Sequence, residues 1–441
     1  MAIRVPDDDR RNDARPEREY KLTPAERLKS AMRDLGPGLI TGAADDDPSG
    51  IATYSQAGAA FGFGFLWSAL ISMPLMSAVQ LMCARVGLVT ERGLASVLRR
   101  HYAPWILWTS CALLLVANTI NIAADLGGMA AATAMLTGVP RVVFVPLYAV
   151  LLLALLIFAS YKVITKIFKW LTLVLFAYVA SAVLAHPNWG DVLRSTFVPH
   201  IEWTRDYLIT FVAILGTTIS PYLFFWQAAS EVEAEEQLKK ELGDRPQRAL
   251  ERELRGVKID VFSGMAFSNI IMYFIILTAG ATLHASGQTD VQTAEQAAQA
   301  LKPIAGPIAS LLFTLGIVGT GLLGVPVLAG SAAYAIAEAA AWRRGMDEKP
   351  RAAPHFYQVM AAAMLIGTGL ALTHFNAIKM LFWAAVVNGL LAPPLIIIIL
   401  FVCNNEKVMG AHKNGKFLNI FGGLAAILMT GAAAALLFSL L

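Results

Sequence analysis

Long apolar runs, each ended by charged or turn-forming residues, recur along the whole chain. Because a helix needs about 20 apolar residues to cross a bilayer, these runs predict about eleven transmembrane spans. The spans are predicted at 37–62, 65–89, 105–136, 140–160, 165–186, 206–230, 259–284, 305–340, 356–374, 378–403 and 417–440. The pattern therefore predicts an all-α polytopic membrane protein whose surroundings are a lipid bilayer.

The composition supports the membrane class. Hydrophobic residues make up 57% of the chain and charged residues only 15%, whereas a soluble domain carries about 25% charged residues. The three cysteines, Cys83, Cys111 and Cys403, show no CxxC or Cys/His spacing. Neither a disulfide framework nor a structural zinc site is therefore expected.

The chain contains no G-x-S-x-G, Walker or H-E-x-x-H motif. These motifs would carry nucleophilic catalysis, nucleotide binding or zinc-dependent hydrolysis. The net charge of +4 gives no support for a nucleic-acid partner. We therefore expect no enzyme activity, no cofactor, no nucleic acid and no obligate protein partner.

The distribution of charge along the chain predicts its orientation. Residues 1–30 are charged and lack an apolar h-region, so 1–35 is expected to be a tail rather than a signal peptide. Loops rich in Lys and Arg alternate with loops that carry few basic residues. By the positive-inside rule, this asymmetry places the N-terminus in the cytoplasm and the protein in the cytoplasmic membrane. The long cytoplasmic loop, 229–258, mixes both signs and is predicted to be a solvated helical hairpin.

Spans one and six differ from the others because polar residues and a proline interrupt their centres. They lie five spans apart, so they are predicted to cross the membrane in opposite directions. Paired broken helices of this kind indicate an inverted-repeat transporter with its substrate between the repeats. We expect a core of about ten helices over 36–403, with repeats at about 36–186 and 206–403, and a further helix at 417–441.

The break in span one lies within "DDDPSG" at 45–50. Proline removes a backbone donor and disfavours helical geometry in the residue before it, so the helix should unwind at Asp47 and restart at Pro48. Freed carbonyls beside a carboxylate at membrane depth would make an oxygen-rich cation site. The alternative is a kinked helix whose carboxylates face an outer vestibule, and it applies most to Asp45 and Asp46.

The break in span six lies within "GTTISPY" at 216–222. Pro221 interrupts this helix in the same way, and Thr217 and Ser220 offer oxygen atoms at the break. No Met, Cys or His is present there. The alternative is an ordinary proline kink whose hydroxyls bond back to the helix.

These stretches resemble one known family. "DPSGIATYSQAGAAFG" from Asp47, "IAADLGG" at 122–128 and "GTTISPY" are similar to the Nramp family of divalent-metal transporters. The corresponding family motifs are Asp-Pro-Gly-Asn, Ala-Thr-Asp-Leu-Ala-Glu and Gly-Ala-Thr-Val-Met-Pro-His. The resemblance covers essentially the whole membrane region. It implies the leucine-transporter-like fold, with two inverted five-helix repeats and an eleventh helix, and it implies that a divalent metal ion is the substrate.

The metal-binding positions depart from the family pattern. Asp47 matches, but Gly50 replaces the metal-binding Asn, Ser220 replaces the metal-binding Met, and Thr217 replaces the Ala that offers its carbonyl. The pattern is most similar to the Nramp-related magnesium transporter branch, which lacks the Met. A thioether favours softer transition metals, so its loss leaves an all-oxygen site. Removing the Asn side chain is expected to widen the site, which suits partly hydrated Mg²⁺, with Mn²⁺ as the alternative.

The proton route implied by the resemblance is also changed. Asp125 matches the span-three Asp, but Gly128 replaces the nearby Glu and Tyr222 replaces the conserved His. No histidine falls at mid-membrane in the predicted spans. Because proton relays need chains of titratable groups, we expect weak or absent proton coupling and import by alternating access, driven by the membrane potential.

Other assignments stay open at this point. Asn388 in span ten lies where the family can supply a polar side chain to the metal, and a helix-to-helix hydrogen bond is the alternative. Asp45 and Asp46 are candidates for a proton pathway or vestibule. Two other functions are also compatible with the sequence, namely a proton-coupled Mn²⁺/Fe²⁺ transporter and an organic-solute symporter of the same fold.

Overall fold

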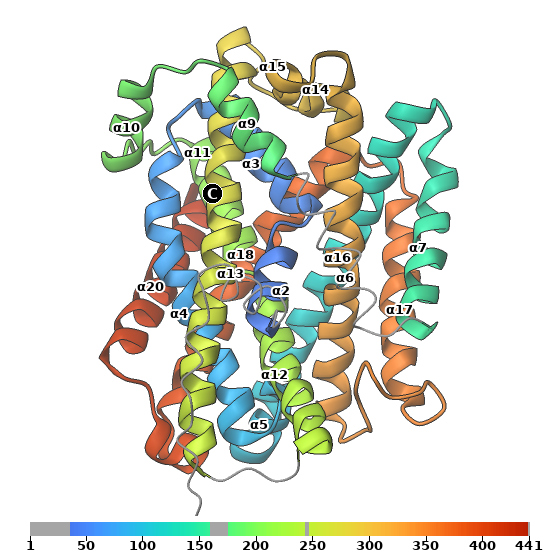
Figure 1. Cartoon of the computed structure of the whole chain (residues 1–441), viewed down its shortest axis with the longest axis vertical. Helices are drawn as coiled ribbons and strands as arrows, with labels where there is room; N and C mark the ends of the chain where they lie inside the picture. The colour runs from blue at the N-terminus through green and yellow to red at the C-terminus, as the bar shows by residue number, and fades with distance from the viewer. Residues whose placement is uncertain (1–35, 159–174, 243–246, 440–441) are drawn as a thin grey trace, which may run out of the picture. The chain divides into compact units, whose positions relative to one another are not determined.

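The structure, a computed structural model, describes residues 36–158, 175–242 and 247–439 (Figure 1). The regular elements of these residues are all helices. The predicted tail and the first part of the predicted fifth span lie outside the described residues. The α-helices are α2 (Pro37–Asp45), α3 (Pro48–Phe61), α4 (Leu66–Thr90), α5 (Leu94–His101), α6 (Pro104–Thr137), α7 (Arg141–Phe158), α9 (Phe176–Leu184), α10 (Trp189–Phe197), α11 (Arg205–Thr218), α12 (Pro221–Leu242), α13 (Gln247–Thr282), α14 (Ala294–Ala298), α15 (Lys302–Ala305), α16 (Ala309–Ala339), α17 (Pro354–Ala371), α18 (Ala377–Asn404), α19 (Glu406–Met409) and α20 (Lys416–Ser439).

Eight segments of the described chain are helical, long and apolar enough to cross a membrane. They include α4, α6, α7, α13, α16, α18 and α20, together with the pair α11 and α12. Of the other predicted spans, the first is divided into the short helices α2 and α3. The ninth corresponds to α17, whose first turns are polar. The all-α, multi-pass class is confirmed, and the number of eleven spans stays a prediction.

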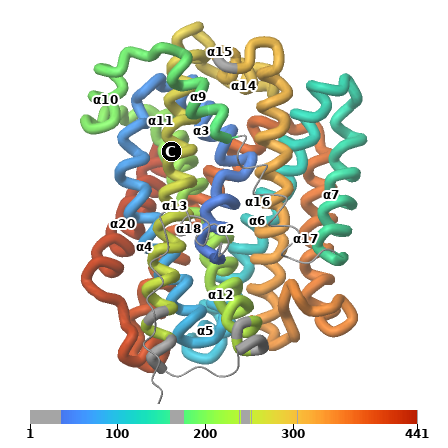
Figure 2. The backbone as a smooth tube through the Cα atoms, in the orientation of Figure 1, coloured from blue at the N-terminus to red at the C-terminus, as the bar shows by residue number. Residues whose placement is uncertain are grey.

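Both predicted helix breaks are present. The first helix ends at Asp45 and α3 begins at Pro48. The second segment stops at Thr218, and α12 begins at Pro221. In Figures 1 and 2, α2 and α12 lie in the lower half of the bundle, and α3 and α11 lie in the upper half. The two broken segments therefore run in opposite directions, as the sequence predicts.

Glycines let the broken helices lie against the backbone of unbroken ones. A Cβ added to Gly42 of α2 would lie 2.2 Å from the carbonyl oxygen of Gly264 on α13. A Cβ on Gly216 of α11 would lie 2.1 Å from the carbonyl oxygen of Ala385 on α18. No other residue fits at such distances, and packing through small residues is usual between membrane helices. Each half of the bundle thus has a broken helix fixed against a continuous one.

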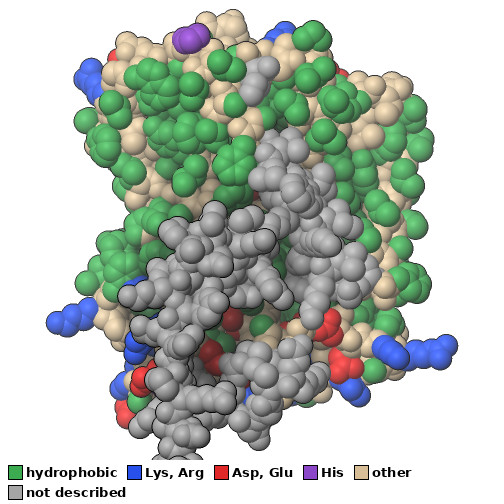
Figure 3. Space-filling view, viewed as in Figure 1, with side chains coloured by type: hydrophobic (Ala, Val, Ile, Leu, Met, Phe, Trp, Pro, Cys, Tyr) green, Lys and Arg blue, Asp and Glu red, His purple; other side chains and the backbone are tan. Residues whose placement is uncertain are grey.

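Apolar side chains cover the outward faces of several helices. Val150 on α7 is 66% exposed, Leu365 on α17 is 65% exposed and Ile427 on α20 is 71% exposed. Such apolar coverage is unusual in water and is expected where lipid is the solvent. In Figure 3, apolar side chains cover much of the upper part and the two sides of the visible face, and most of the acidic side chains in view lie toward the lower edge.

The predicted cytoplasmic loop 229–258 is mostly helical. α12 continues to Leu242 and α13 begins at Gln247. The described part of this segment is therefore helical, and its assignment as a cytoplasmic hairpin stays a prediction. Its turn, 243–246, lies outside the described residues.

Candidate functional site

Asp47 lies at the first break and caps the N-terminus of α3. Its Oδ1 accepts hydrogen bonds from the backbone N–H of Gly50 (2.8 Å) and the hydroxyl of Ser49 (2.6 Å). Asp before a first-turn proline is a favoured helix start, which explains why the chain restarts at Pro48. The side chain is only 1% exposed. Because a carboxylate can accept about four hydrogen bonds, Asp47 is held in place with lone pairs to spare.

Tyr222 of α12 connects the two breaks. Its hydroxyl lies 3.1 Å from Oδ2 of Asp47 and 3.0 Å from the carbonyl oxygen of Ala44 in α2. The carbonyl oxygen of Tyr222 accepts a hydrogen bond from Ser331 of α16 (2.7 Å). One hydroxyl proton serves two acceptors here, so Asp47 and the end of α2 compete for it. The sequence predicted a changed relay position at Tyr222 and did not predict this direct contact with Asp47.

Ser220 bonds back to the helix that precedes it. Its hydroxyl lies 2.8 Å from the carbonyl oxygen of Thr217 and 3.0 Å from that of Gly216. The alternative of a proline kink with returned hydroxyls therefore describes this part of the break. The Thr217 carbonyl, which was expected to be free, already accepts a hydrogen bond. Ser220 Oγ nevertheless keeps its lone pairs, so it remains a neutral oxygen that can face a cation.

The two breaks approach each other at Gly50 and Thr217, in addition to the contact between Tyr222 and Asp47. A Cβ on Gly50 would lie 3.1 Å from Thr217 Oγ1, 3.3 Å from the ring of Tyr54 and 3.4 Å from the carbonyl oxygen of Asp45. Glycine was expected to widen the site. In this structure Thr217 and Tyr54 lie at tight contact distance from an added Cβ at position 50, so the structure shows little open space directly beside Gly50.

Asp125 of α6 faces the same centre from the other side. Its carboxylate is fully buried, and neither oxygen has a hydrogen-bond partner among the described residues. A Cβ on Gly324 of α16 would lie 3.0 Å from the Cβ of Asp47 and 3.7 Å from Oδ2 of Asp125. An added carbon at position 324 would thus approach both side chains, so Asp125 lies near Asp47, and its part in a proton pathway stays a prediction.

Two neighbours of Asp125 on α6 also bear on the chemistry. A Cβ on Gly128 would lie 2.7 Å from Leu381 of α18, so a leucine fills the direction in which the family's Glu would extend. Met129 lies beside Pro48, because a Cβ on Gly321 of α16 would be 2.4 Å from its Sδ and 3.1 Å from Cγ of Pro48. The residues at the two breaks did not predict the sulfur of Met129, because it comes from α6.

Asp45 and Asp46 are buried rather than placed in a vestibule. Both side chains are 0% exposed, and both accept from the hydroxyl of Ser268 on α13, at 2.7 Å for Asp45 and 3.2 Å for Asp46. Both side chains therefore lie between α2 and α13 in this structure, and their assignment to a proton pathway or vestibule stays a prediction. Ser268 was not predicted to be a site residue.

Asn388 of α18 is paired with Asn121 of α6. The two side-chain amides exchange hydrogen bonds of 2.9 Å and 3.1 Å. This is the helix-to-helix alternative for Asn388. A role as metal ligand would require that reciprocal pair to open.

The carboxylates around the first break, those of Asp45, Asp46, Asp47 and Asp125, have no basic partner among the described residues. The salt bridges found there join other acidic side chains, such as Glu338 with Arg344 (2.8 Å) and Glu91 with Lys239 (2.6 Å). In the same part of the chain, no three His, Cys, Asp or Glu residues are grouped closely enough to hold an ion. Mg²⁺ does not need such a group, since one or two carboxylates and retained waters suffice. The carbonyl ends of α2 and α11 add negative partial charge at both breaks.

Two cavities lie on either side of the breaks. The larger, about 750 Å³, is lined by Ala52 and Gln56 of α3, by Asp206 and Thr210 of α11, and by Lys379 of α18. It reaches Ala52, a short distance along α3 from Gly50. None of the predicted site residues lines this cavity.

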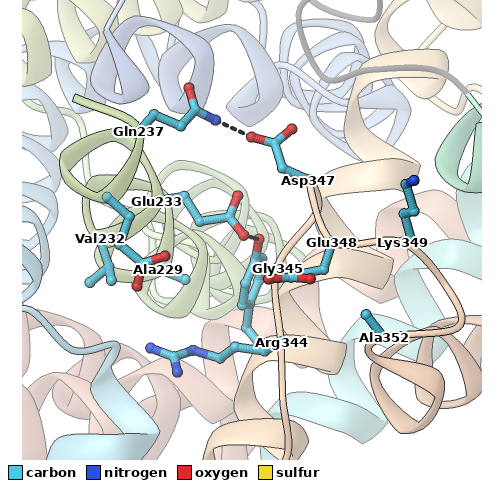
Figure 4. Close-up of a pocket in the computed structure, with 12 residues that line it drawn as sticks. Ala229, Val232, Glu233, Gln237, Arg344, Gly345, Asp347, Glu348, Lys349 and Ala352 are labelled. Carbon is cyan, nitrogen blue, oxygen red and sulfur yellow. Dashed lines mark hydrogen bonds between the residues drawn. The ribbon is translucent and has the colours of Figure 1, made fainter. Parts of the chain in front are cut away.

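The smaller cavity, about 350 Å³, lies between α12 and the segment 340–353 (Figure 4). Glu233 of α12 accepts a hydrogen bond from the backbone N–H of Met346 (2.8 Å), and Gln237 donates one to Asp347. These bonds fasten the segment after α16 to α12. None of the predicted site residues lines this cavity.

Comparison with known proteins identifies the family. The Nramp profile, described as natural resistance-associated macrophage protein-like, matches residues 38–439. The chain belongs to the Nramp family. The match includes both helix breaks and all the site residues described above.

Relatives of this Nramp chain include two proteins named divalent metal cation transporter MntH. The one from Aeromonas hydrophila is 26% identical over 433 residues, which is 95% of this chain and 98% of that protein. The one from Yersinia enterocolitica is 26% identical over 423 residues, covering 94% and 96%. These relatives are transporters, so the Nramp chain is a transport protein and not an enzyme.

Solved structures agree on the fold. A manganese transporter of Eremococcus coleocola superposes with a TM-score of 0.72 at 18% identity, covering 94% of this chain and 87% of that chain. Mhp1, a nucleobase-cation-symport-1 family transporter, superposes with a TM-score of 0.56 at 13% identity, covering 92% of each chain. The Nramp chain therefore has the leucine-transporter-like fold that the sequence predicted.

Proposed function

We propose that this Nramp protein imports a divalent metal cation, chiefly Mg²⁺, across the cytoplasmic membrane by alternating access. The observation that carries the proposal is the buried carboxylate of Asp47 at the meeting point of two broken helices. A carboxylate at membrane depth costs several kcal/mol unless a cation offsets its charge. The MntH relatives, named for divalent metal cation transport, support the same substrate class.

The preference for Mg²⁺ rests on the atoms at the breaks. Asp47, Thr217 and Ser220 offer oxygen, and the family's thioether position holds the Ser220 hydroxyl. Hard, reluctantly dehydrated Mg²⁺ prefers such a shell, whereas a thioether would favour a softer metal. Mn²⁺ accepts a similar shell and is expected to be a second substrate. The sulfur of Met129 lies beside Pro48, so its part in selectivity needs a direct control.

Weak proton coupling is supported by two contacts. Tyr222, at the family's His position, bonds to Asp47, and Leu381 occupies the space beside Gly128. With both relay positions changed, import would be driven by the membrane potential. Two charges moving through 100 mV gain about 4.6 kcal/mol, at about 2.3 kcal/mol per charge.

A proton-coupled Mn²⁺ transporter is the second candidate. Asp125 favours it, because a buried carboxylate without a hydrogen-bond partner among the described residues is a suitable proton carrier. The neighbouring changes at Gly128 and Tyr222 leave Asp125 without an evident onward acceptor. This difference makes the uniporter the preferred candidate.

Transport assays in reconstituted vesicles distinguish the uniporter from the proton-coupled transporter. Initial rates of Mg²⁺, Mn²⁺ and Ca²⁺ uptake into proteoliposomes would be measured at a fixed membrane potential, with a pH-sensitive dye inside. Uniport of Mg²⁺ predicts uptake that follows the potential without acidification of the lumen. Acidification that is proportional to metal uptake, and that is lost in Asp125→Asn, would support the proton-coupled candidate instead. No uptake of any of the three ions would contradict both.

A further inference from the structure

The carboxylates of Asp45 and Asp46 share one hydrogen-bond donor. Ser268 Oγ lies 2.7 Å from Oδ2 of Asp45 and 3.2 Å from Oδ1 of Asp46. A serine hydroxyl carries one proton, so it cannot satisfy both carboxylates at once. The other oxygens, Oδ1 of Asp45 and Oδ2 of Asp46, are buried and have no partner among the described residues.

Two further hydroxyls converge on the same place. The hydroxyl of Tyr54 and Oγ1 of Thr217 are both buried and lie next to each other beside Gly50. Tyr54 interacts electrostatically with both Asp45 and Asp46. Around Gly50, Thr217 Oγ1, the Tyr54 ring and the Asp45 carbonyl oxygen lie within 3.4 Å of one point. The region therefore gathers carboxylate, hydroxyl and carbonyl oxygens, and one oxygen of each carboxylate has no partner among the described residues.

Two adjacent buried carboxylates, each with an oxygen that has no partner among the described residues, favour a cation beside them. Burying two adjacent carboxylates without compensation costs several kcal/mol each. Carboxylate and carbonyl oxygens are the ligands that Mg²⁺ and Mn²⁺ take from proteins. The Asp-Pro-Gly-Asn motif begins only at Asp47, so Asp45 and Asp46 add charge that the motif does not include.

The position of Ser268 links this oxygen cluster to the packing of α2. Asp260, Gly264 and Ser268 follow one another at intervals of four on α13, so they share one face of that helix. Asp260 accepts from the backbone N–H groups of Gly38 (2.7 Å) and Leu39 (3.2 Å), and Gly264 packs against the middle of α2. An ion bound beside Ser268, the third of these residues, would hold the end of α2 against α13.

We propose that Asp45, Asp46 and Ser268 form a second divalent-cation subsite, beside Asp47 on the α2 side of the break. Tyr54 and Thr217 face it and supply neutral oxygens. The inference rests on the proposed function, because the same ion passes from Asp47 to this subsite on its way along α2. The ion occupies the two positions in turn, so binding at the second does not require Asp47.

The test is Mn²⁺ binding to the purified full-length protein in nanodiscs, followed by the loss of the free-ion electron paramagnetic resonance signal. Asp47→Asn is expected to retain one Mn²⁺ per chain, with affinity lowered on the order of tenfold to a hundredfold. Adding Asp45→Asn and Asp46→Asn should remove that remaining binding. Adding Ser268→Ala instead should weaken it roughly tenfold without changing the charge. Excess Mg²⁺ should displace the bound Mn²⁺ in each binding variant.

The matched control is Asp47→Asn combined with Asp260→Asn. Asp260 also contacts α2 from α13 but lies outside the subsite, so this control should bind Mn²⁺ like Asp47→Asn alone. Gel filtration and thermal unfolding report whether each variant is folded. If the triple variant does not fold, the comparison of Asp47→Asn alone with Asp47→Asn combined with Ser268→Ala decides whether the second subsite exists.

The outcomes separate the two proposals. A folded Asp47→Asn protein that binds no Mn²⁺ would overturn the second subsite and leave the proposed function intact. Binding that is unchanged when Asp45, Asp46 or Ser268 is altered would overturn it as well. A wild-type protein that binds no dication would contradict the proposed function and, with it, this inference.

Discussion

At the first helix break three consecutive carboxylates are buried, whereas at the second break only hydroxyl and carbonyl groups are present. Both breaks use a proline to restart the helix, at Pro48 and Pro221. The first break turns to other helices for its hydrogen bonds, through Tyr222 and Ser268. At the second break, polar groups of the same turn bond to each other, because the Ser220 hydroxyl donates to the carbonyl oxygen of Thr217.

This difference separates two tasks that a metal site must perform. The charged break supplies the attraction that draws a dication out of water. The neutral break can then change the kind of ligand without changing the charge of the site. In the proposed site the second break offers the Ser220 hydroxyl, while the first break offers the Asp47 carboxylate. Selectivity and affinity should therefore respond to different substitutions.

The largest effect is expected from Asp47. Asp47→Ala removes the helix cap and the charge together, and we expect metal uptake by proteoliposomes to fall by about 100-fold or more, equivalent to about 2.8 kcal/mol. Asp47→Asn is the matched control, because Asn also caps helices but carries no charge. Uptake near the wild-type rate in Asp47→Asn would show that charge at the first break is not required.

Ser220→Met should change selectivity rather than charge. A thioether favours softer metals, so the ratio of Mn²⁺ to Mg²⁺ uptake is expected to rise on the order of tenfold. Competition between the two ions in the same vesicles measures this ratio. Met129→Leu is the control, because it removes the nearby sulfur and should leave the ratio unchanged. A shift of the ratio in Met129→Leu would mean that the metal contacts sulfur in the native site.

Tyr222→Phe tests the link between the breaks. The substitution removes one hydrogen bond to Asp47, worth about 1.5–3 kcal/mol when the acceptor is charged. We expect uptake to fall about tenfold or somewhat more, with the same preference among metals. Ser331→Ala removes the bond to the Tyr222 backbone instead and should have a smaller effect. Equal rates in Tyr222→Phe and wild type would show that the hydroxyl does not position Asp47.

The smallest effect on transport is expected from the amide pair. Asn388→Ala and Asn121→Ala each leave a buried amide without its partner, which should lower stability by about 1–3 kcal/mol. Thermal unfolding in detergent measures this change, and the double variant should cost less than the sum of the two. If Asn388 were a metal ligand, Asn388→Ala would reduce uptake much more than Asn121→Ala.

The sequence was sufficient for the fold class and for the positions of the breaks. A proline beside polar residues stands out within an apolar run, so the restarts at Pro48 and Pro221 followed from local chemistry. The opposite directions of the two segments followed from counting spans. These features depend on residues that are adjacent in the chain, which is why they could be predicted.

The contacts between helices could not be predicted in the same way. Ser268 lies 223 residues from Asp45, on a helix whose apolar residues do not mark one buried face. Its partnership depends on how α13 is rotated against α2, which is decided by backbone contacts at Gly42 and Gly264. The approach of Thr217 to Gly50 likewise joins residues far apart in the chain. A contact of this kind leaves no mark in a uniformly apolar pattern.

Gly324 shows how a residue without a side chain can belong to an ion pathway. It lies where a single added carbon would come within 3.0 Å of the Asp47 side chain and 3.7 Å of the Asp125 carboxylate. An alanine at 324 would act as a wedge between the two acids while leaving every ligand atom in the sequence unchanged. Natural variants of Nramp proteins that alter this position should therefore be grouped with those that alter the carboxylates themselves.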